Sequence, residues 1–327
     1  MTDAPTIGVL VMAYGTAAGP DDIERYYTDI RGGRPPSPEH LQELRDRYEA
    51  IGNVFPLGET TAAQAEGIVE RLNADHAGSS YRAYLGMKHS PPFIPDTVAA
   101  MRADGIERAI GIVMAPHWSG MSVETYVERV RQAVDDHGET PAFTFVRSYH
   151  DHPAFVAFLA GRVREALDEL PAEVSDDPAV IFSAHSLPVR TVDDGSLRCK
   201  LCDCDHSCRY RDGLQETADL VAGRLGLDDY LIAWQSAGRT ADPWWGPPVE
   251  EVIQQLAMQG SPAVVVCSAG FVADHLEILY DLDIEARQVA EEAGLAFGRT
   301  RMPNADPAYL DVLAQVVRDH MAQVPAT

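Results

Sequence analysis

The feature that most constrains the fold is a repeated alternation of short apolar runs with longer amphipathic stretches. The apolar runs are rich in Val, Ile, Phe and Ala, which is typical of buried strands, and the stretches between them have helical periodicity. Such alternation indicates parallel sheets covered by helices, because parallel strands need a crossover segment between them. The predicted strands are Ile7–Ala13, Tyr81–Leu85, Ala109–Met114, Phe143–Val146, Ala179–Phe182, Tyr230–Trp234, Ala263–Cys267 and Leu295–Gly298. The clearest predicted helices are Leu41–Ile51, Thr61–Asn73, Val123–Asp136, Pro153–Leu170, Asp274–Ala293 and Pro307–Val324.

The predicted strands form two groups of four, separated by the segment Tyr149–Pro153. We therefore expect an α/β fold of two Rossmann-like domains, each with a four-stranded parallel sheet flanked by helices. The first domain would span residues 1–150 and the second residues 151–327, with the last helix packing back on the first domain. Small, polar and His residues follow many of the strands, and this edge of an α/β sheet is where ligands bind. The two domains are therefore expected to face each other across a cleft.

Composition argues against several classes of function. The 327 residues carry a formal net charge of -24, which disfavours nucleic acid and anionic membranes as partners. No apolar run reaches the roughly 18 residues that a membrane span needs, and no signal-type segment opens the chain. Nucleotide binding has no support from a phosphate-binding loop or a G-x-G-x-x-G turn. We expect a soluble cytoplasmic protein.

Three carboxylates recur at helical spacing after one of the predicted strands. Glu277, Asp281 and Glu285 are four residues apart, so a helix would place them in one row about 12 Å long. Alone, such a row is more typical of the solvated face of a surface helix. This row directly follows the strand 263–267, which puts its first turn at the ligand edge of the sheet. There it can lead a cation inward or carry protons outward.

A single histidine stands at the end of another predicted strand, in the sequence Ser183-Ala184-His185-Ser186. A lone His is more often structural than catalytic, but its position at a strand end favours a function. A neutral imidazole is able to bind Fe²⁺ or to accept a proton.

These residues belong to segments that resemble the signatures of the ferrochelatase family. The segments are Ser183–Pro188, Gly270–Glu277, Met12–Thr16, Lys88-His89, Ala115–Ser119 and Trp234–Ser236. Each is weak alone, but their number, order and spacing make the resemblance strong. It runs from about Ile7 to beyond Asn304, and in particular the chain resembles the soluble coproporphyrin-type enzymes of Gram-positive and related bacteria.

The resemblance implies a lyase of haem biosynthesis that inserts Fe²⁺ into a porphyrin, with coproporphyrin III as the expected substrate. It implies that His185 and Glu277 handle the metal and the pyrrole protons, with Asp281 and Glu285 as a candidate metal or proton path. Tyr14 would lie over one face of the porphyrin as a candidate axial contact. The residues that match contacts to the macrocycle and its propionates are Arg31, Arg47, Tyr48 and Tyr126.

Several alternatives stay open at this point. The substrate could be protoporphyrin IX, or the chain could insert another metal into another tetrapyrrole. A porphyrin or haem carrier is the alternative from a different class, and it would need an axial ligand but no row of carboxylates. Phe55 stands where the family has a propionate-contacting serine, so one hydrogen bond of the family's pattern is in question. The expected partners are the porphyrin, Fe²⁺ and, as a candidate, a downstream haem-synthesis enzyme that receives the product.

Four of the five cysteines lie within ten residues, in the spacing C-x₂-C-x-C-x₃-C. They are Cys199, Cys202, Cys204 and Cys208. In a cytosolic chain such clustering indicates metal binding, because disulfides are rare there. The segment is predicted to be an insertion between the His185 loop and a helix near Leu214–Leu225, and a metal centre would order it. Cys267 is predicted to be a buried strand residue.

Thiolates suit either an iron–sulfur cluster or zinc, for which His206 is an alternative ligand. Some ferrochelatases carry a [2Fe–2S] cluster on cysteines, so the resemblance implies that cluster, with Zn²⁺ as the alternative. An iron–sulfur sensor is a further hypothesis, but it leaves His185 and Glu277 unexplained.

Overall fold

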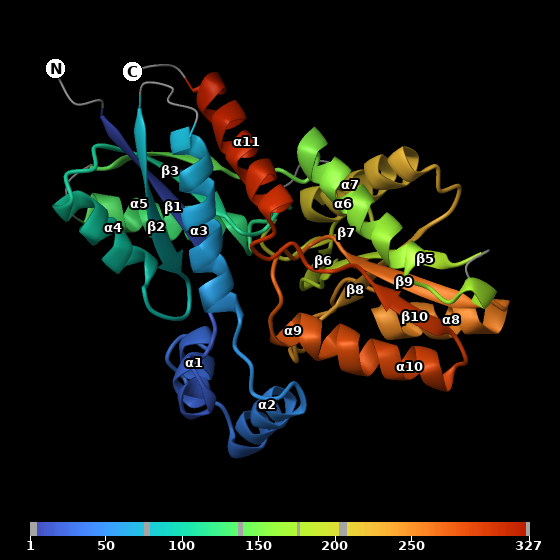
Figure 1. Ribbon diagram of the computed structural model, residues 1–327. Coiled ribbons are helices and arrows are strands. Elements are labelled where there is room, and N and C mark those ends of the chain that lie inside the picture. The colour runs from blue at the N-terminus through green and yellow to red at the C-terminus, as the bar shows by residue number, and fades with distance from the viewer. Residues whose placement is uncertain (1–4, 75–78, 137–139, 175–176, 203–207, 325–327) are drawn as a thin grey trace.

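The computed structural model describes residues 5–74, 79–136, 140–174, 177–202 and 208–324. Its two four-stranded parallel sheets confirm the predicted α/β class (Figure 1). The first sheet has the order β2-β1-β3-β4 and the second the order β10-β9-β5-β8. The strands of the first sheet are β1 (Thr6–Ala13), β2 (Ser80–Met87), β3 (Arg108–Val113) and β4 (Ala142–Val146). Those of the second are β5 (Ala179–His185), β8 (Leu231–Gln235), β9 (Ala263–Ser268) and β10 (Ala296–Arg299).

The central strands are apolar throughout because helices cover both faces of each sheet. β1 pairs with β2 on one side and β3 on the other, and β5 pairs with β8 and β9. The helices are α1 (Ile23–Ile30), α2 (Pro38–Ala50), α3 (Leu57–Ala74), α4 (Ile94–Ala103), α5 (Val123–Asp135), α6 (Pro153–Asp168), α7 (Arg209–Leu225), α8 (Val249–Gln259), α9 (Leu276–Leu279), α10 (Arg287–Glu292) and α11 (Pro307–Gln323). A short antiparallel pair, β6 (Val189–Thr191) and β7 (Leu197–Cys199), was not predicted.

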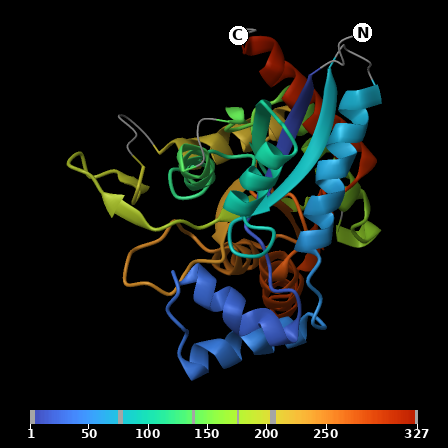
Figure 2. The same ribbon diagram turned by 90° about the vertical axis from the view of Figure 1, so that its left-hand side faces the viewer.

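Helices α1 and α2 form a separate pair that lies beyond the N-terminal end of α3, away from both termini (Figures 1 and 2). Ser37 caps α2 by accepting a hydrogen bond from the backbone N–H of His40, and Pro38 occupies the first turn, where its missing N–H costs nothing. The pair has its own small core, which includes Tyr26 and Tyr48, and Leu276 of α9 packs against it. The α1–α2 pair therefore packs against the start of α9, which belongs to the second half of the chain.

The prediction of one regular helix over 274–293 is wrong. His275 is extended, so α9 begins at Leu276, and a π-helix over Asp281–Ala286 separates α9 from α10. Within it the backbone N–H of Glu285 donates to the carbonyl of Tyr280, five residues back. Side-chain spacing does not distinguish a single wide turn from regular helix, and such turns are frequent at functional sites.

Helix α11 runs beside α3 of the first sheet (Figure 1). The Tyr149 and Tyr309 hydroxyls lie 3.1 Å apart, and Arg71 of α3 forms an ion pair with Asp311 of α11. One hydrophobic core contains residues of both sheets, for example Val9 and Phe182. The limits 1–150 and 151–327 stay a prediction. Among the described residues, no helix combines the length and the apolar character that a bilayer crossing requires.

Candidate functional site

His185 and Glu277 face each other at the carboxyl edge of the second sheet. The Nε2 atom of His185, the last residue of β5, lies 3.7 Å from Oε1 of Glu277 in α9. Nδ1 of His185 donates to the carbonyl of Ser186, so Nε2 is the nitrogen available for a proton or a metal. On the other side, Nε2 of His275 lies 3.5 Å from Oε2 of Glu277. The Glu277 carboxylate is therefore held between two imidazoles.

The charges of this pair reinforce each other. Burial would raise the pKa of Glu277, but His185 and His275 outweigh burial and hold that pKa well below its usual range. Burial would lower the pKa of His185, and the Glu277 carboxylate outweighs it, so the pKa of His185 is raised. The pair thus favours an ionised carboxylate beside an imidazole that readily binds a proton.

Asp281, four residues after Glu277, is buried. Its side chain is 5% exposed, and burial together with the charge of Glu277 raises the pKa of its carboxyl group to about 7. Ser236, after β8, donates to one carboxylate oxygen, and Nη1 of Arg47 in α2 lies 3.5 Å from the other. Glu285 contributes a smaller charge effect on Asp281. Asp281 and Glu285 both lie in the π-helix that follows α9, and a metal or proton path through the three carboxylates stays a prediction.

Two tyrosines of the first half of the chain, Tyr14 and Tyr48, lie close enough to Glu277 for its charge to affect their hydroxyls. Tyr14 follows β1, and the surrounding protein and then the charge of Glu277 raise the pKa of its hydroxyl. The residue as a whole is 42% exposed, and its ring centroid lies 4.5 Å from that of His89. Burial first, and Glu277 as a smaller cause, raise the pKa of Tyr48 as well. An exposed aromatic residue near the His185–Glu277 pair suits contact with a flat ligand.

The other residues predicted to contact the porphyrin differ in their surroundings. Tyr126 of α5 is buried, and Nζ of Lys88 lies 5.2 Å from its ring centroid. Phe55 stacks on Tyr48 with ring centroids 4.5 Å apart. Arg31, at the end of α1, contacts Tyr27 and Arg34 of its own segment, and no contact joins it to the His185–Glu277 pair among the described residues.

Sequence reasoning missed three residues of this site. His275 lies in the quoted family segment but was not predicted to act. Lys88 donates to Thr125 Oγ1 at 2.8 Å, and burial, with Arg129 second, lowers the pKa of its amine to about 8. Gln235, at the end of β8, donates to the backbone carbonyl of Glu277 at 3.4 Å. The sequence held a signal for each of them. Lys88 directly follows a strand, Gln235 ends one, and His275 is two residues before Glu277.

Two of the described cysteines, Cys199 and Cys208, lie close together. Sγ of Cys199 and Sγ of Cys208 lie 3.0 Å apart and both residues are buried. Trp245 donates its indole N–H to the Cys199 sulfur at 3.3 Å, and the backbone N–H of Cys199 lies 3.5 Å from the Cys208 sulfur. Cys202 is in a disulfide in this structure, and a metal centre would need its reduced form. Cys204 and His206 lie outside the described residues. Cys267 is fully buried in β9.

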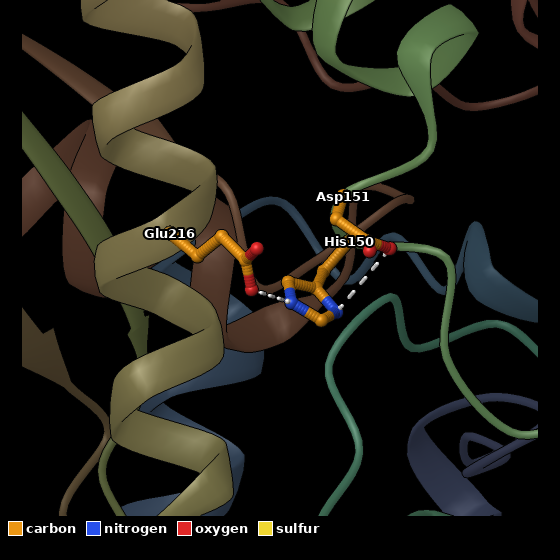
Figure 3. A group of neighbouring side chains, drawn as sticks. All are labelled: His150, Asp151 and Glu216. Atoms are coloured by element: carbon orange, nitrogen blue, oxygen red, sulfur yellow. Dashed lines mark hydrogen bonds and ion pairs between the residues drawn. The ribbon is translucent and has the colours of Figure 1, made fainter.

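A second group of potential metal ligands lies elsewhere, at the start of α6 and on α7 (Figure 3). Nε2 of His150 is 3.0 Å from Oε2 of Glu216, whereas Asp151 approaches the opposite ring nitrogen at 4.0 Å. Both carboxylates are more than half exposed. Nδ1 of His150 is already hydrogen-bonded with Ser148 Oγ at 2.6 Å, and exposed acidic groups like these two are common without a metal, so we assign no metal to this group.

A cavity of about 370 Å³ lies near the start of α11. Three of its lining side chains are arginines, Arg162, Arg299 and Arg301. Each of them pairs with a carboxylate, so their charges are already neutralised within the protein.

The fold is shared with proteins of the chelatase class. SirB from Bacillus subtilis with Fe³⁺ superposes with a TM-score of 0.59 at 9% identity, covering 97% of this chain and 96% of that one. The sirohydrochlorin chelatase SirB from Bacillus subtilis subspecies spizizenii, in complex with cobalt, gives 0.54 at 8% identity, covering 97% and 95%. At such identities the likeness shows the fold alone.

The family itself is shown by sequence. The ferrochelatase family model matches residues 6–321. The chain is 45% identical over 316 residues to the coproporphyrin III ferrochelatase of Anoxybacillus flavithermus, covering 96% of each protein. It is 44% identical over 312 residues to that of Bacillus subtilis, covering 95% of this chain and 96% of the relative. The chain belongs to the ferrochelatase family, whose members are lyases that act on a porphyrin and Fe²⁺. The resemblance read from the motifs is confirmed at this level.

Proposed function

We propose that this chain inserts Fe²⁺ into coproporphyrin III. The observation that carries the proposal is the pair of His185 Nε2 and Glu277 Oε1, 3.7 Å apart at the ligand edge of the second sheet. The names of the relatives, at 42–45% identity over nearly the whole chain, support coproporphyrin III as the substrate. We extend the proposal to a cytoplasmic location and to transfer of the product to a downstream haem-synthesis enzyme.

The reaction exchanges two pyrrole N–H protons for one Fe²⁺ ion. His185 accepts a proton at Nε2, which is the ring nitrogen that faces Glu277. The ionised Glu277 carboxylate attracts the incoming cation and stabilises the imidazolium that forms. Asp281, whose pKa is about 7, is suited to exchange protons near neutral pH and to pass them along toward Glu285.

Substrate binding must overcome the overall charge of -24, because coproporphyrin III carries four propionates. Arg47 of α2 is positioned to contribute a guanidinium, since its Cζ atom lies 4.7 Å from the centroid of the Tyr280 ring. Lys88 and Arg31 supply further positive charge from the first half of the chain. Tyr14 offers its exposed ring to one face of the macrocycle. Contacts at the periphery offset the cost of bending the ring for metal entry.

The proposal is tested by anaerobic Fe²⁺ insertion with His185→Ala and Glu277→Gln. Both variants should lose insertion by at least about a hundredfold, while porphyrin binding, followed by fluorescence quenching, persists. The matched controls are His150→Ala and Glu216→Gln, which remove the partners of a second His–Glu pair outside the site. Near wild-type turnover in either site variant would show that the assigned role is wrong.

The choice of substrate is tested by comparing coproporphyrin III with protoporphyrin IX in the same assay. A preference for coproporphyrin III is expected, and equal turnover and affinity would count against it. Retained metal-free porphyrin with no insertion under reducing conditions would favour the carrier alternative.

We further propose that Cys199, Cys202, Cys204 and Cys208 hold a [2Fe–2S] cluster, with Zn²⁺ as the alternative. The convergence of the Cys199 and Cys208 sulfurs, buried and 3.0 Å apart, supports a shared metal centre. Hydrogen bonds from N–H groups to these sulfurs are of the kind that stabilises thiolate-bound iron. Such a cluster would order the segment, and metal insertion needs no electron transfer from it.

Metal and sulfide analysis of anaerobically purified protein tests this cofactor. About two irons and two acid-labile sulfides per chain, with a red-brown colour, are expected. Colourless protein with one zinc would replace the cluster by a zinc site. Full activity and an unchanged melting temperature in metal-free protein would remove both alternatives.

A further inference from the structure

The backbone of His185 is held by a residue of the helix that follows the cysteines. The hydroxyl of Tyr210 donates a hydrogen bond of 2.9 Å to the carbonyl oxygen of His185. Tyr210 is buried and is the second residue of α7, two positions after Cys208. Because His185 is the last residue of β5, this bond fixes the main chain at the point where it leaves the sheet.

Residues 186–189, which follow His185, are hydrogen-bonded to the chain around Cys199, where the segment that carries the four clustered cysteines (the cysteine segment) begins. Val189 pairs with Cys199 in the β6–β7 ladder, and the backbone N–H of Lys200 donates to the carbonyl of Pro188 at 2.8 Å. Residues 185–189 are therefore anchored at one end to the start of α7 and at the other to β7. Both anchors adjoin cysteines.

Two tryptophans fix the direction from which Tyr210 approaches. The Tyr210 ring lies 5.8 Å from that of Trp234, which stacks on Trp245 with centroids 5.7 Å apart. Trp245 donates its indole N–H to the Cys199 sulfur and its backbone N–H to the carbonyl of Leu187. A continuous set of contacts thus joins the Cys199 sulfur, the aromatic rings and the His185 loop.

We propose that Tyr210 is a positioning residue that couples the cysteine segment to the placement of the His185 imidazole. Order at Cys199 and Cys208 fixes the start of α7, and Tyr210 transmits that order to the His185 carbonyl. The orientation of the ring follows the backbone, because Nδ1 of His185 donates to the adjacent carbonyl of Ser186. This inference rests on the proposed role of His185 in insertion. It gives the cysteine segment a mechanical effect on the rate without any electron transfer.

The test begins with Tyr210→Phe, which removes the hydroxyl and keeps the ring packing. We expect kcat for Fe²⁺ insertion to fall about tenfold, because small misplacements of a reacting group are costly. The porphyrin dissociation constant and the visible spectrum of the isolated protein should not change. Tyr309→Phe is the matched control, since it removes a buried hydroxyl on α11 that contacts Tyr149 instead of His185. A fall in kcat in both variants alike would overturn the proposal.

A second readout does not depend on activity. Hydrogen–deuterium exchange of the backbone amides of residues 183–189 should become faster in Tyr210→Phe and in Cys199→Ser. The double variant should exchange no faster than Cys199→Ser alone, because the same connection is already broken. If Cys199→Ser does not fold, Trp245→Phe replaces it, since this change keeps every cysteine and removes the indole bond to sulfur.

The outcomes distinguish this inference from the proposed function. The coupling would be overturned if Tyr210→Phe left amide exchange at residues 183–189 unchanged. It would also be overturned if Tyr210→Phe and Cys199→Ser accelerated exchange independently, so that the double variant exchanged faster than either single variant. Both outcomes apply regardless of the catalytic role of His185. If His185→Ala retained insertion, the catalytic role would fail while the exchange result still reported on the coupling itself.

Discussion

Asp281→Asn removes a carboxyl group that the folded protein prefers to keep protonated. Its pKa is raised from 3.8 to about 7, so the folded state binds the proton more tightly than the unfolded chain does. A group with a raised folded pKa contributes stability below its unfolded pKa and loses it as pH rises through its folded pKa. The loss in wild type therefore begins near pH 4 and is complete just above pH 7. Its total is about 4 kcal/mol at 1.36 kcal/mol per pH unit.

The Asn variant stays neutral at every pH and lacks this loss. The protein is least soluble near its pI of 4.7, so the useful window starts at pH 5.5. Between pH 5.5 and pH 8 the variant should gain about 2 kcal/mol relative to wild type. For a chain of 327 residues this corresponds to a Tm difference that grows by about 3 °C across the window.

Differential scanning calorimetry of both proteins from pH 5.5 to pH 8 measures this difference. Asp306→Asn is the matched control, because Asp306 caps α11 and, despite burial, its pKa is lowered by the Ala308 N–H and Arg162. Stability from such a lowered pKa is lost only as pH falls through it, so the control's Tm difference should be flat over the same window. A flat difference for Asp281→Asn would refute the reasoning, since it would mean that the carboxyl group does not retain a proton in the folded state. Insertion by the Asn variant should be slower, because Asn cannot accept a proton.

Arg47→Ala and Arg31→Ala should raise the apparent KM more for coproporphyrin III than for protoporphyrin IX, because the first substrate has four propionates and the second two; equal increases in steady-state assays would contradict this. Gly270→Ala should lower Tm by about 1–4 °C and reduce kcat, since overpacking costs about 1–3 kcal/mol and the added Cβ would lie 2.9 Å from the backbone Cα of Ala184, next to His185. Gly223→Ala in α7 is its control, because the added Cβ meets nothing within 4 Å. Equal Tm values for the two variants would show that the structure around Gly270 relaxes without loss of stability.

Much of the fold could be predicted because buried parallel strands are apolar throughout and are short. Each of the predicted strands corresponds to a strand of the two sheets. The edge location of His185 and Glu277 followed from the same pattern, since ligand-binding residues follow strands directly. The β6–β7 pair was not predicted, because strands of three residues are too short to show a periodic pattern in the sequence.

The contacts that tune the site could not be predicted, for reasons of geometry. Residues two apart do not face each other in a helix, so His275 and Glu277 were not expected to pair. They do so because His275 is extended, with φ of -160°, and lies outside α9. The Arg47–Asp281 ion pair and the Tyr210 hydrogen bond join segments far apart in the chain, and sequence patterns carry no signal for such pairs.

The position of α11 against α3 also determines the order in which the chain can fold. Ile68 and Leu72 of α3 share a hydrophobic core with Tyr309 and Val316 of α11. The first sheet is complete at Val146, yet roughly 160 residues separate it from α11. At about 5–20 residues per second, a ribosome needs roughly 8 to 32 s to deliver that covering helix. During this time the nascent first half exposes an apolar face of α3, so the first half reaches its native packing only after α11 has been synthesised.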